Sequence, residues 1–162
     1  MKQFQKLYEE NIILDNIFDL LYNNKDKEII EKNILELLVE LGELANETRC
    51  FKYWSDKEPS KKEVIMDEYA DCLIMVLHFC NMANIKLDDK FEIVYEKNIV
   101  KQFKDLYKLV SKLNSEFDVN VIKLILSNLI NLGKLLGFTD EDIIEGSIKK
   151  INRNKERFNT GF

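Results

Sequence analysis

Apolar residues recur at intervals of three and four along almost the whole chain, the spacing that gathers them on one face of an α-helix. The pattern predicts an all-α structure, a helical bundle of about six helices. A chain of 162 residues usually buries one core, so we expect a single domain over 1–162. The expected helices lie near residues 2–22, 28–50, 61–84, 88–114, 118–136 and 140–158.

Polar and glycine residues mark the ends of these helices. The asparagine pair at 23–24 interrupts the first two, and 55–60, which holds the only proline, separates the second from the third. Gly137 suits the end of the fifth helix, and Thr139 with Asp142 three residues later resembles a capping box that opens the sixth.

Composition narrows the class of protein. The chain is 46% hydrophobic and 33% charged, with one proline and five glycines, which is too apolar for disorder and has too few turn residues for a β-sandwich. A net charge of −5, with both signs spread along the chain, argues against general nucleic-acid binding. The start, MKQFQKLYEE, is charged where a signal peptide is apolar, and no apolar run approaches the roughly 20 residues of a membrane span. We therefore expect a cytoplasmic protein with no membrane partner.

Thiols and imidazoles are too few for several kinds of site. Cys50, Cys72 and Cys80 are odd in number and form no C-x-x-C pair, so we expect packing residues, not a disulfide framework or a zinc site. The lone histidine, His78, lies along an apolar helix and is expected to be a core residue. A di-iron bundle would need two Glu-x-x-His pairs, and the sequence has none.

One face of the second predicted helix is acidic. Its four glutamates fall within about 60° of one another on a helical projection, and no lysine or arginine relieves their repulsion. An ordinary solvated face usually mixes both signs, although a single pair of this kind is also common by chance. The four residues are Glu36, Glu40, Glu43 and Glu47.

The third predicted helix carries a second acidic pair, Glu68 and Asp71. It is apolar nearly all round from Val64 to Cys80, so Asp71 should not face open water, and a buried carboxylate without a partner is costly. Two helices joined by a short loop should be antiparallel neighbours, so the two pairs can converge on one divalent cation. All-oxygen ligands favour Mg²⁺ or Mn²⁺, and Mg²⁺ with few carboxylates suits a phosphorylated small molecule.

The last predicted helix complements this with positive charge. Its cationic and amide side chains lie within about 60° on one face and suit phosphate oxygens. The alternative is a C-terminal helix whose cations only stabilise its dipole. The residues of this stripe are Lys150, Arg153, Asn154 and Arg157.

The two acidic pairs resemble a known signature. Glu40-x-x-Glu43, a 24-residue interval and Glu68-x-x-Asp71 are similar to the metal motif of the all-α nucleoside triphosphate pyrophosphohydrolases, and within them of the dimeric, all-helical dUTP diphosphatases. The surrounding segments ELANETRCFKYW and DEYADCL are similar too, as is LYEENIILDNI near the start. The resemblance implies that the metal ligands are Glu40, Glu43, Glu68 and Asp71.

The resemblance extends to the tail and to the base site. In that family a Lys-x3-Asn-x2-Arg run followed by Gly and an aromatic residue binds the substrate's phosphates. The matching residues here are Lys150, Asn154, Arg157, Gly161 and Phe162.

Two positions expected near the nucleobase depart from the family's pattern. Asn11 stands where members usually carry glutamine, in a helix associated with uracil recognition, and Ile74-Met75 stand where histidine-phenylalanine is common. Asn11 keeps an amide that can donate and accept hydrogen bonds. Trp54, the only tryptophan, is a candidate to cover the base or sugar, with core packing as the alternative.

The resemblance implies an Mg²⁺-dependent dUTP diphosphatase that converts dUTP, and also dUDP, with dUMP and pyrophosphate as the products from dUTP. Two or more Mg²⁺ ions (or Mn²⁺) and Glu40 as general base are expected. The apolar content of the fourth and fifth helices also allows a homodimer. The alternatives are the same chemistry on another nucleotide such as dCTP, and a non-catalytic helical module whose acidic stripe binds a basic partner.

Overall fold

The computed structural model describes residues 1–22 and 27–160. Within these residues all regular structure is helical, which confirms the all-α prediction and the number of helices. The elements are a 3-10 turn η1 (Lys2–Phe4), α1 (Gln5–Tyr22), α2 (Lys27–Thr48), α3 (Lys62–Met82), α4 (Ile99–Val110), α5 (Val119–Leu135) and α6 (Asp140–Thr160). The predicted break at 23–24, Gly161 and Phe162 lie outside the described residues.

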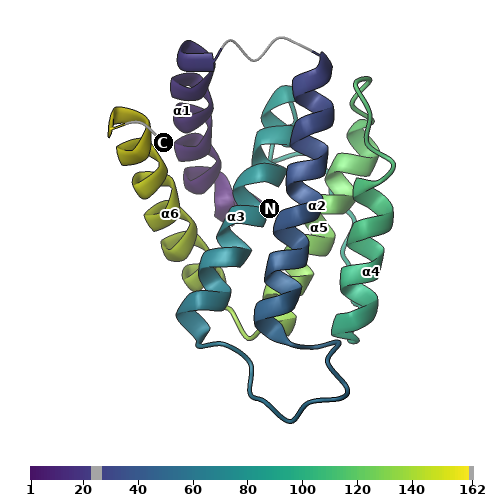
Figure 1. Cartoon of the computed structure of the whole chain (residues 1–162). Coiled ribbons are helices and arrows are strands. Elements are labelled where there is room, and N and C mark those ends of the chain that lie inside the picture. The colour runs from purple at the N-terminus through teal and green to yellow at the C-terminus, as the bar shows by residue number, and fades with distance from the viewer. Residues whose placement is uncertain (23–26, 161–162) are drawn as a thin grey trace.

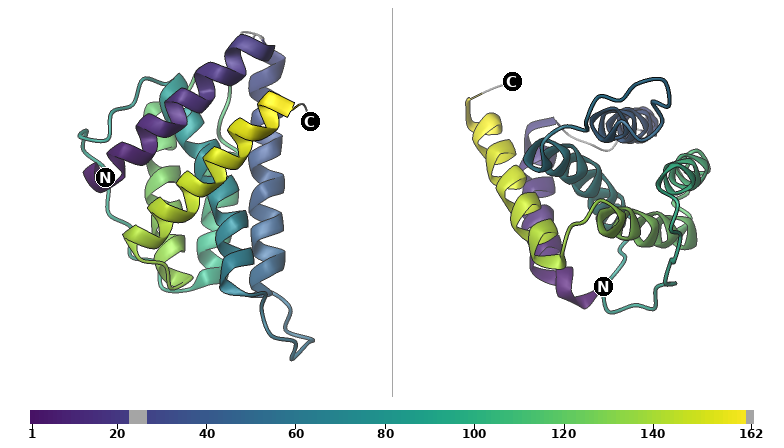
Figure 2. Two further views of the ribbon diagram at one scale, coloured as in Figure 1. Left: turned by 90° about the vertical axis from the view of Figure 1, so that its left-hand side faces the viewer. Right: turned by 90° about the horizontal axis from the view of Figure 1, so that it is seen from below.

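Helix α3 is the centre of the bundle. It packs against α1, α2, α5 and α6, while α4 packs against α2 and α5. Helices α2 and α3 stand upright and antiparallel, and α1 and α6 lie side by side and slant across them on one flank (Figures 1 and 2). The arrangement leaves one face of α3 opposite α2 and α6 at once.

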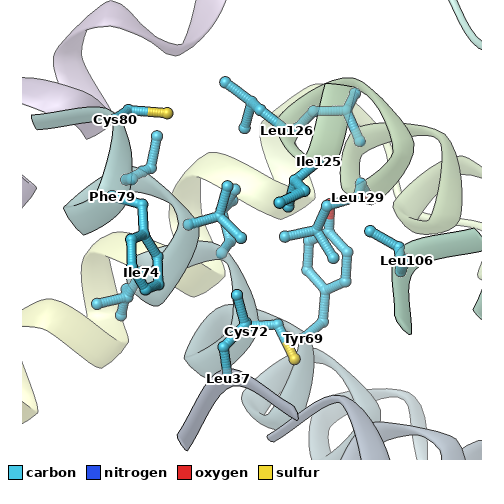
Figure 3. Close-up of a cluster of buried hydrophobic side chains, with 14 of the residues drawn as sticks. Leu37, Tyr69, Cys72, Ile74, Phe79, Cys80, Leu106, Ile125, Leu126 and Leu129 are labelled. Carbon is cyan, nitrogen blue, oxygen red and sulfur yellow. The ribbon is translucent and has the colours of Figure 1, made fainter. Parts of the chain in front are cut away.

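The burial of α3 follows from its sequence, which is apolar on nearly every side. Tyr69, Cys72 and Phe79 are among its fully buried side chains, and they meet side chains from α2, α4 and α5 (Figure 3). Tyr69 also donates a hydrogen bond from its hydroxyl to the Leu129 carbonyl oxygen, 2.8 Å away. Cys80 is buried and Cys50 packs against the core; all three cysteines are free, in agreement with the packing prediction.

The predicted signals between α5 and α6 are confirmed. Gly137 has φ +84°, a left-handed conformation that glycine adopts without strain, directly after the end of α5. The Thr139 backbone N–H donates to the Asp142 carboxylate (3.0 Å), and the Asp142 N–H donates to the Thr139 hydroxyl (3.1 Å). This reciprocal cap fixes where α6 begins and therefore which of its side chains reach α3.

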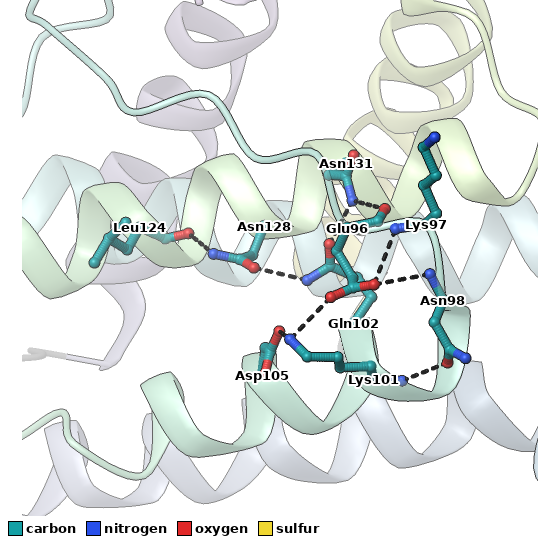
Figure 4. Close-up of polar contacts among 9 residues, drawn as sticks. All are labelled: Glu96, Lys97, Asn98, Lys101, Gln102, Asp105, Leu124, Asn128 and Asn131. Atoms are coloured by element: carbon teal, nitrogen blue, oxygen red, sulfur yellow. Dashed lines mark hydrogen bonds and ion pairs between the residues drawn. The ribbon is translucent and has the colours of Figure 1, made fainter.

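The prediction of a helix over 88–114 was wrong at both ends. Residues 88–98 form no helix, and around Glu96 polar side chains bond the backbone instead (Figure 4). The Glu96 carboxylate accepts from the N–H groups of Lys97 and Asn98, both at 3.0 Å, and Asn131 donates to the Glu96 carbonyl oxygen at 2.9 Å. The Asn98 side chain then accepts from the Lys101 N–H and caps α4.

A glycine brings α6 close to α3. A Cβ added at Gly146 would lie 2.6 Å from both Cγ and Sδ of Met66, so a larger residue would force the Met66 side chain to move. One turn later, α6 presents Lys150 to the polar side of α3.

Among the described residues no single helix has both the length and the apolar composition to cross a membrane; α5 and α6 meet the test only as a pair bent by 109°.

Candidate active site

Carboxylates from α2 and α3 meet in one place. Glu40 on α2, with Glu68 and Asp71 on α3, each offer an oxygen atom, and these atoms lie within 4.8 Å of one another. Glu43, three residues along α2, shares a hydrogen bond with Glu40. The structure thus brings together Glu40, Glu43, Glu68 and Asp71, the four expected metal ligands, because α2 and α3 are antiparallel neighbours (Figure 1).

This crowding changes the acidity of the cluster. Burial, followed by the negative charges of Asp71 and Glu43, raises the pKa of Glu40 to about 8 and that of Glu68 to about 7. One carboxylate oxygen of each, Oε2, is buried with no hydrogen-bond donor among the described residues. Buried anionic oxygens without donors need a cation, and an all-oxygen set without histidine or thiolate fits a hard divalent ion such as Mg²⁺ or Mn²⁺.

Lys150 of α6 reaches the same cluster. Its nearly buried Nζ lies 2.9 Å from Asp71 Oδ2 and 2.9 Å from Asp67 Oδ2. Arg153 forms a second ion pair with Asp67. Burial raises the pKa of Asp71 although Lys150 opposes the shift, whereas at Asp67 the hydrogen bonds from Lys150 and Arg153 outweigh burial and lower the pKa.

The role of Asp67 was missed in the sequence. An acidic residue beside Glu68 reads as part of a solvated helix face, and nothing local indicates that α6 covers it. The one available signal was the basic stripe itself. Lys150 is buried, and a buried cation needs an acidic partner, which here is Asp67 together with Asp71.

A cavity of about 280 Å³ opens beside the carboxylates. Its lining includes Glu40 and Asp71 together with Lys150, Asn154 and Arg157. Three residues of the basic stripe therefore face the same space as two of the acidic residues. Such a lining can hold a phosphate chain between a bound cation and fixed positive side chains.

The rest of the cavity lining combines apolar side chains with polar groups. Its polar residues are Asp15, Asn33, Glu36 and His78. His78 was expected to be a core residue; its side chain is mostly buried, lines the cavity and pairs with Asp15, with Nδ1 3.0 Å from Asp15 Oδ1. Asp15 lies 63 residues away in the sequence, so this partner was not predicted. The apolar wall consists of Leu14, Phe18, Ile74, Met75 and Phe158.

Neither of the two predicted base-site residues lines this cavity. Asn11 is fully buried and donates to the Ile74 carbonyl oxygen at 3.4 Å, and its own Oδ1 has no partner among the described residues. Trp54 is 64% exposed in the α2–α3 connection, where its ring contacts Phe51 and Tyr53. Trp54 is therefore not a core residue. Glu47, left without a role in the sequence, accepts a hydrogen bond from Ser60.

Comparison with known proteins agrees with this geometry. A family model described as dUTPase matches residues 3–162, nearly the whole chain. No curated protein gave a significant match. The family implies a nucleotide substrate and a divalent metal cofactor, for which the acidic cluster is the candidate site. From the match over its whole length, the chain belongs to the dUTPase family and is a hydrolase of the nucleoside triphosphate diphosphatase type.

Proposed function

We propose that this protein hydrolyses dUTP between the α- and β-phosphates to dUMP and pyrophosphate, and accepts dUDP as well, with Mg²⁺ held by Glu40, Glu43, Glu68 and Asp71. The observation that carries the proposal is the meeting of two opposed sets of side chains in one cavity. Glu40 and Asp71 line it from α2 and α3, and Lys150, Asn154 and Arg157 line it from α6.

The reaction needs one bond made and one broken. The oxygen of a water molecule attacks the α-phosphorus, the bond to the bridging oxygen breaks, and pyrophosphate leaves with that oxygen. When bound, Mg²⁺ supplies positive charge to the phosphate chain and activates the water. Two or more ions are proposed because four carboxylates exceed what one Mg²⁺ usually takes from protein.

Glu40 is proposed to accept the proton of the attacking water. Glu40 lines the cavity, and its carboxylate meets those of Glu68 and Asp71, so it can accept a proton from a water held there. The phosphate oxygens are bound by Lys150, Asn154 and Arg157. The guanidinium group of Arg157 can donate two hydrogen bonds at once and offsets the charge that develops on the leaving group. Lys150 is already ordered for this role by its contacts with Asp67 and Asp71.

Other parts of the expected function stay predictions. Asn11 and Trp54 as substrate contacts, the homodimer, the cytoplasmic location and the organisation of 1–162 as one domain all rest on the resemblance or on sequence patterns. Trp54, exposed at 64%, would need a partner or a bound substrate to cover it.

The test is the formation of monophosphate and pyrophosphate from a panel of dUTP, dUDP, dCTP, dTTP and dATP, with Mg²⁺ and with a chelator. Glu40→Gln should reduce Mg²⁺-dependent turnover of dUTP by about 100-fold or more, the scale of a lost general base. Glu31→Gln is the matched control, since Glu31 is an exposed glutamate of the same helix outside the cavity.

Full turnover by Glu40→Gln, or turnover that a chelator leaves unchanged, would contradict the proposal. Preference for dCTP would keep the chemistry and change the substrate.

A further inference from the structure

Lys150 on α6 bridges two aspartates of α3. Its Nζ lies 2.9 Å from Asp67 Oδ2 and 2.9 Å from Asp71 Oδ2. The two aspartates are four residues apart, about one helical turn, so they lie on the same face of α3. Asp71 is one of the expected metal ligands, and Asp67 is not. The lysine is therefore shared between the carboxylate cluster and an acid beside it.

This ammonium group is the counter-ion of the cluster. Among the described residues, no other lysine, arginine or histidine forms an ion pair with any of the four expected metal ligands. The Lys150 side chain is nearly buried, so water solvates little of its charge. A carboxylate must balance that charge wherever the end of the side chain lies.

A divalent cation at Asp71 would compete with this contact. The metal and the ammonium both seek the oxygen atoms of one carboxylate, and two cations so close to each other repel strongly in a partly buried site. The divalent ion carries twice the charge, so Nζ should move away from Asp71 Oδ2 when the metal is bound. A buried lysine that lost this contact and gained no other would be left without a counter-charge, which is costly.

Asp67 is placed to keep the displaced ammonium. Its Oδ2 already accepts a hydrogen bond from Nζ, and Arg153 of α6 forms a second ion pair with it. Asp67 neither lines the cavity nor belongs to the group of carboxylates whose oxygen atoms lie within 4.8 Å of one another. The end of the lysine therefore needs only to turn from Asp71 towards Asp67, and its buried stem can stay in place.

We propose that Lys150 is a tethered cation that competes with the metal for Asp71, and that Asp67 is a positioning residue that holds Lys150 clear of Asp71 when the metal is bound. This inference rests on the metal site of the proposed function and goes beyond the phosphate contact proposed for Lys150. It makes the affinity for the metal depend on Asp67, a residue that does not bind the metal itself.

The test measures the affinity for Mn²⁺ without nucleotide, from the signal of the free ion in electron paramagnetic resonance. Lys150→Met removes the ammonium at similar length and should strengthen Mn²⁺ binding about tenfold or more, the scale of one partly buried charge. Asp67→Asn leaves Asp71 as the only carboxylate partner of the lysine and should weaken binding by about the same factor. A merely structural role would weaken binding in both variants.

Lys149→Met is the matched control. Lys149 is an exposed lysine of the same helix that does not line the cavity, so its removal should change the Mn²⁺ affinity by less than about twofold. Circular dichroism checks that each variant folds. Binding that is weakened or unchanged in Lys150→Met would by itself overturn the inference.

The double variant separates the action of Asp67 through Lys150 from the direct attraction between its own charge and the metal. In the Lys150→Met background, Asp67→Asn should weaken Mn²⁺ binding by less than about threefold, since no ammonium remains to be held. An equal loss in both backgrounds would overturn the role of Asp67. A wild-type protein that binds no Mn²⁺ would refute the metal site of the proposed function, whereas the comparison among variants needs no hydrolysis and stands even if dUTP is not the substrate.

Discussion

The carboxylates of Glu40 and Glu68 illustrate how a site can be unfavourable to the fold that carries it. Both acids lose hydration and face other acids, and their pKa values rise to about 8 and about 7. Lys150 offsets part of the negative charge through Asp71, but the buried Oε2 atoms of Glu40 and Glu68 have no donor among the described residues. The ion-free cluster therefore stores a destabilisation that a cation would relieve.

This predicts how the stability of the metal-free protein depends on pH. Between the ordinary carboxyl pKa of 4.5 and the raised values, the folded state binds protons that the unfolded chain does not. The free energy of unfolding should then increase as pH falls from about 8 towards 5, because stability falls with rising pH wherever the folded state holds more protons. The pKa of Asp67 is lowered, so this residue changes the free energy of unfolding only below its ordinary pKa of 3.8, which is outside this pH window.

Urea unfolding with a chelator across this pH range measures the effect. Glu40→Gln should flatten the dependence, and Glu31→Gln should not. Stability that rises with pH over the same range would contradict the raised pKa values.

At the scale of elements, α4 shows how side-chain contacts can override a helical pattern. The apolar spacing continues back to residue 88, yet Glu96 and Asn98 satisfy the local backbone and the helix begins only at Ile99. The sixth helix is the opposite case, since Thr139 and Asp142 announce its start in the sequence and form the cap. The cap of α6 could be predicted because its two side chains, Thr139 and Asp142, lie only three residues apart in the sequence.

Asn98→Ala distinguishes a cap from a mid-helix position by the sign of its effect. If Asn98 caps α4, the variant should lose about 1 kcal/mol of unfolding free energy. A residue inside a helix over 88–114 would instead gain several tenths of a kcal/mol, since alanine is the better helix former. Equilibrium unfolding in urea gives the answer, with Asn152→Ala, at an exposed asparagine inside α6, as the mid-helix comparison.

For the molecule as a whole, binding should be visible as added stability. If they bind as proposed, Mg²⁺ and a non-hydrolysable dUTP analogue should stabilise the folded state by mass action, by about 2.7 kcal/mol at a ligand concentration 100 times the dissociation constant. Thermal unfolding should show a rise in Tm with both present, and the rise should be smaller with either alone. Glu40→Gln should remove most of it; an unchanged Tm in the wild-type protein would count against the site.

The sequence predicted the parts of this molecule that depend on one helix or on neighbouring helices. The apolar circumference of α3, the acidic faces of α2 and α3 and the basic face of α6 were all legible, and so was the meeting of Glu40 with Asp71. It did not predict that Asp67 holds Lys150, or that His78 pairs with Asp15 inside a cavity. Those contacts join α3 to α6 and α1, and which faces meet there depends on packing that the pattern of one chain does not specify.

The cavity is lined along α2 by Asn33 and Glu40 and along α3 by Asp71 and His78, and the two residues of each pair are seven apart. The rise of these two helices therefore sets the length of this lining, and the connection at 49–61 contributes nothing to it. Residues inserted in that connection would leave this length unchanged. One residue inserted between Asp71 and His78 would rotate the imidazole by about 100° and turn it away from the cavity.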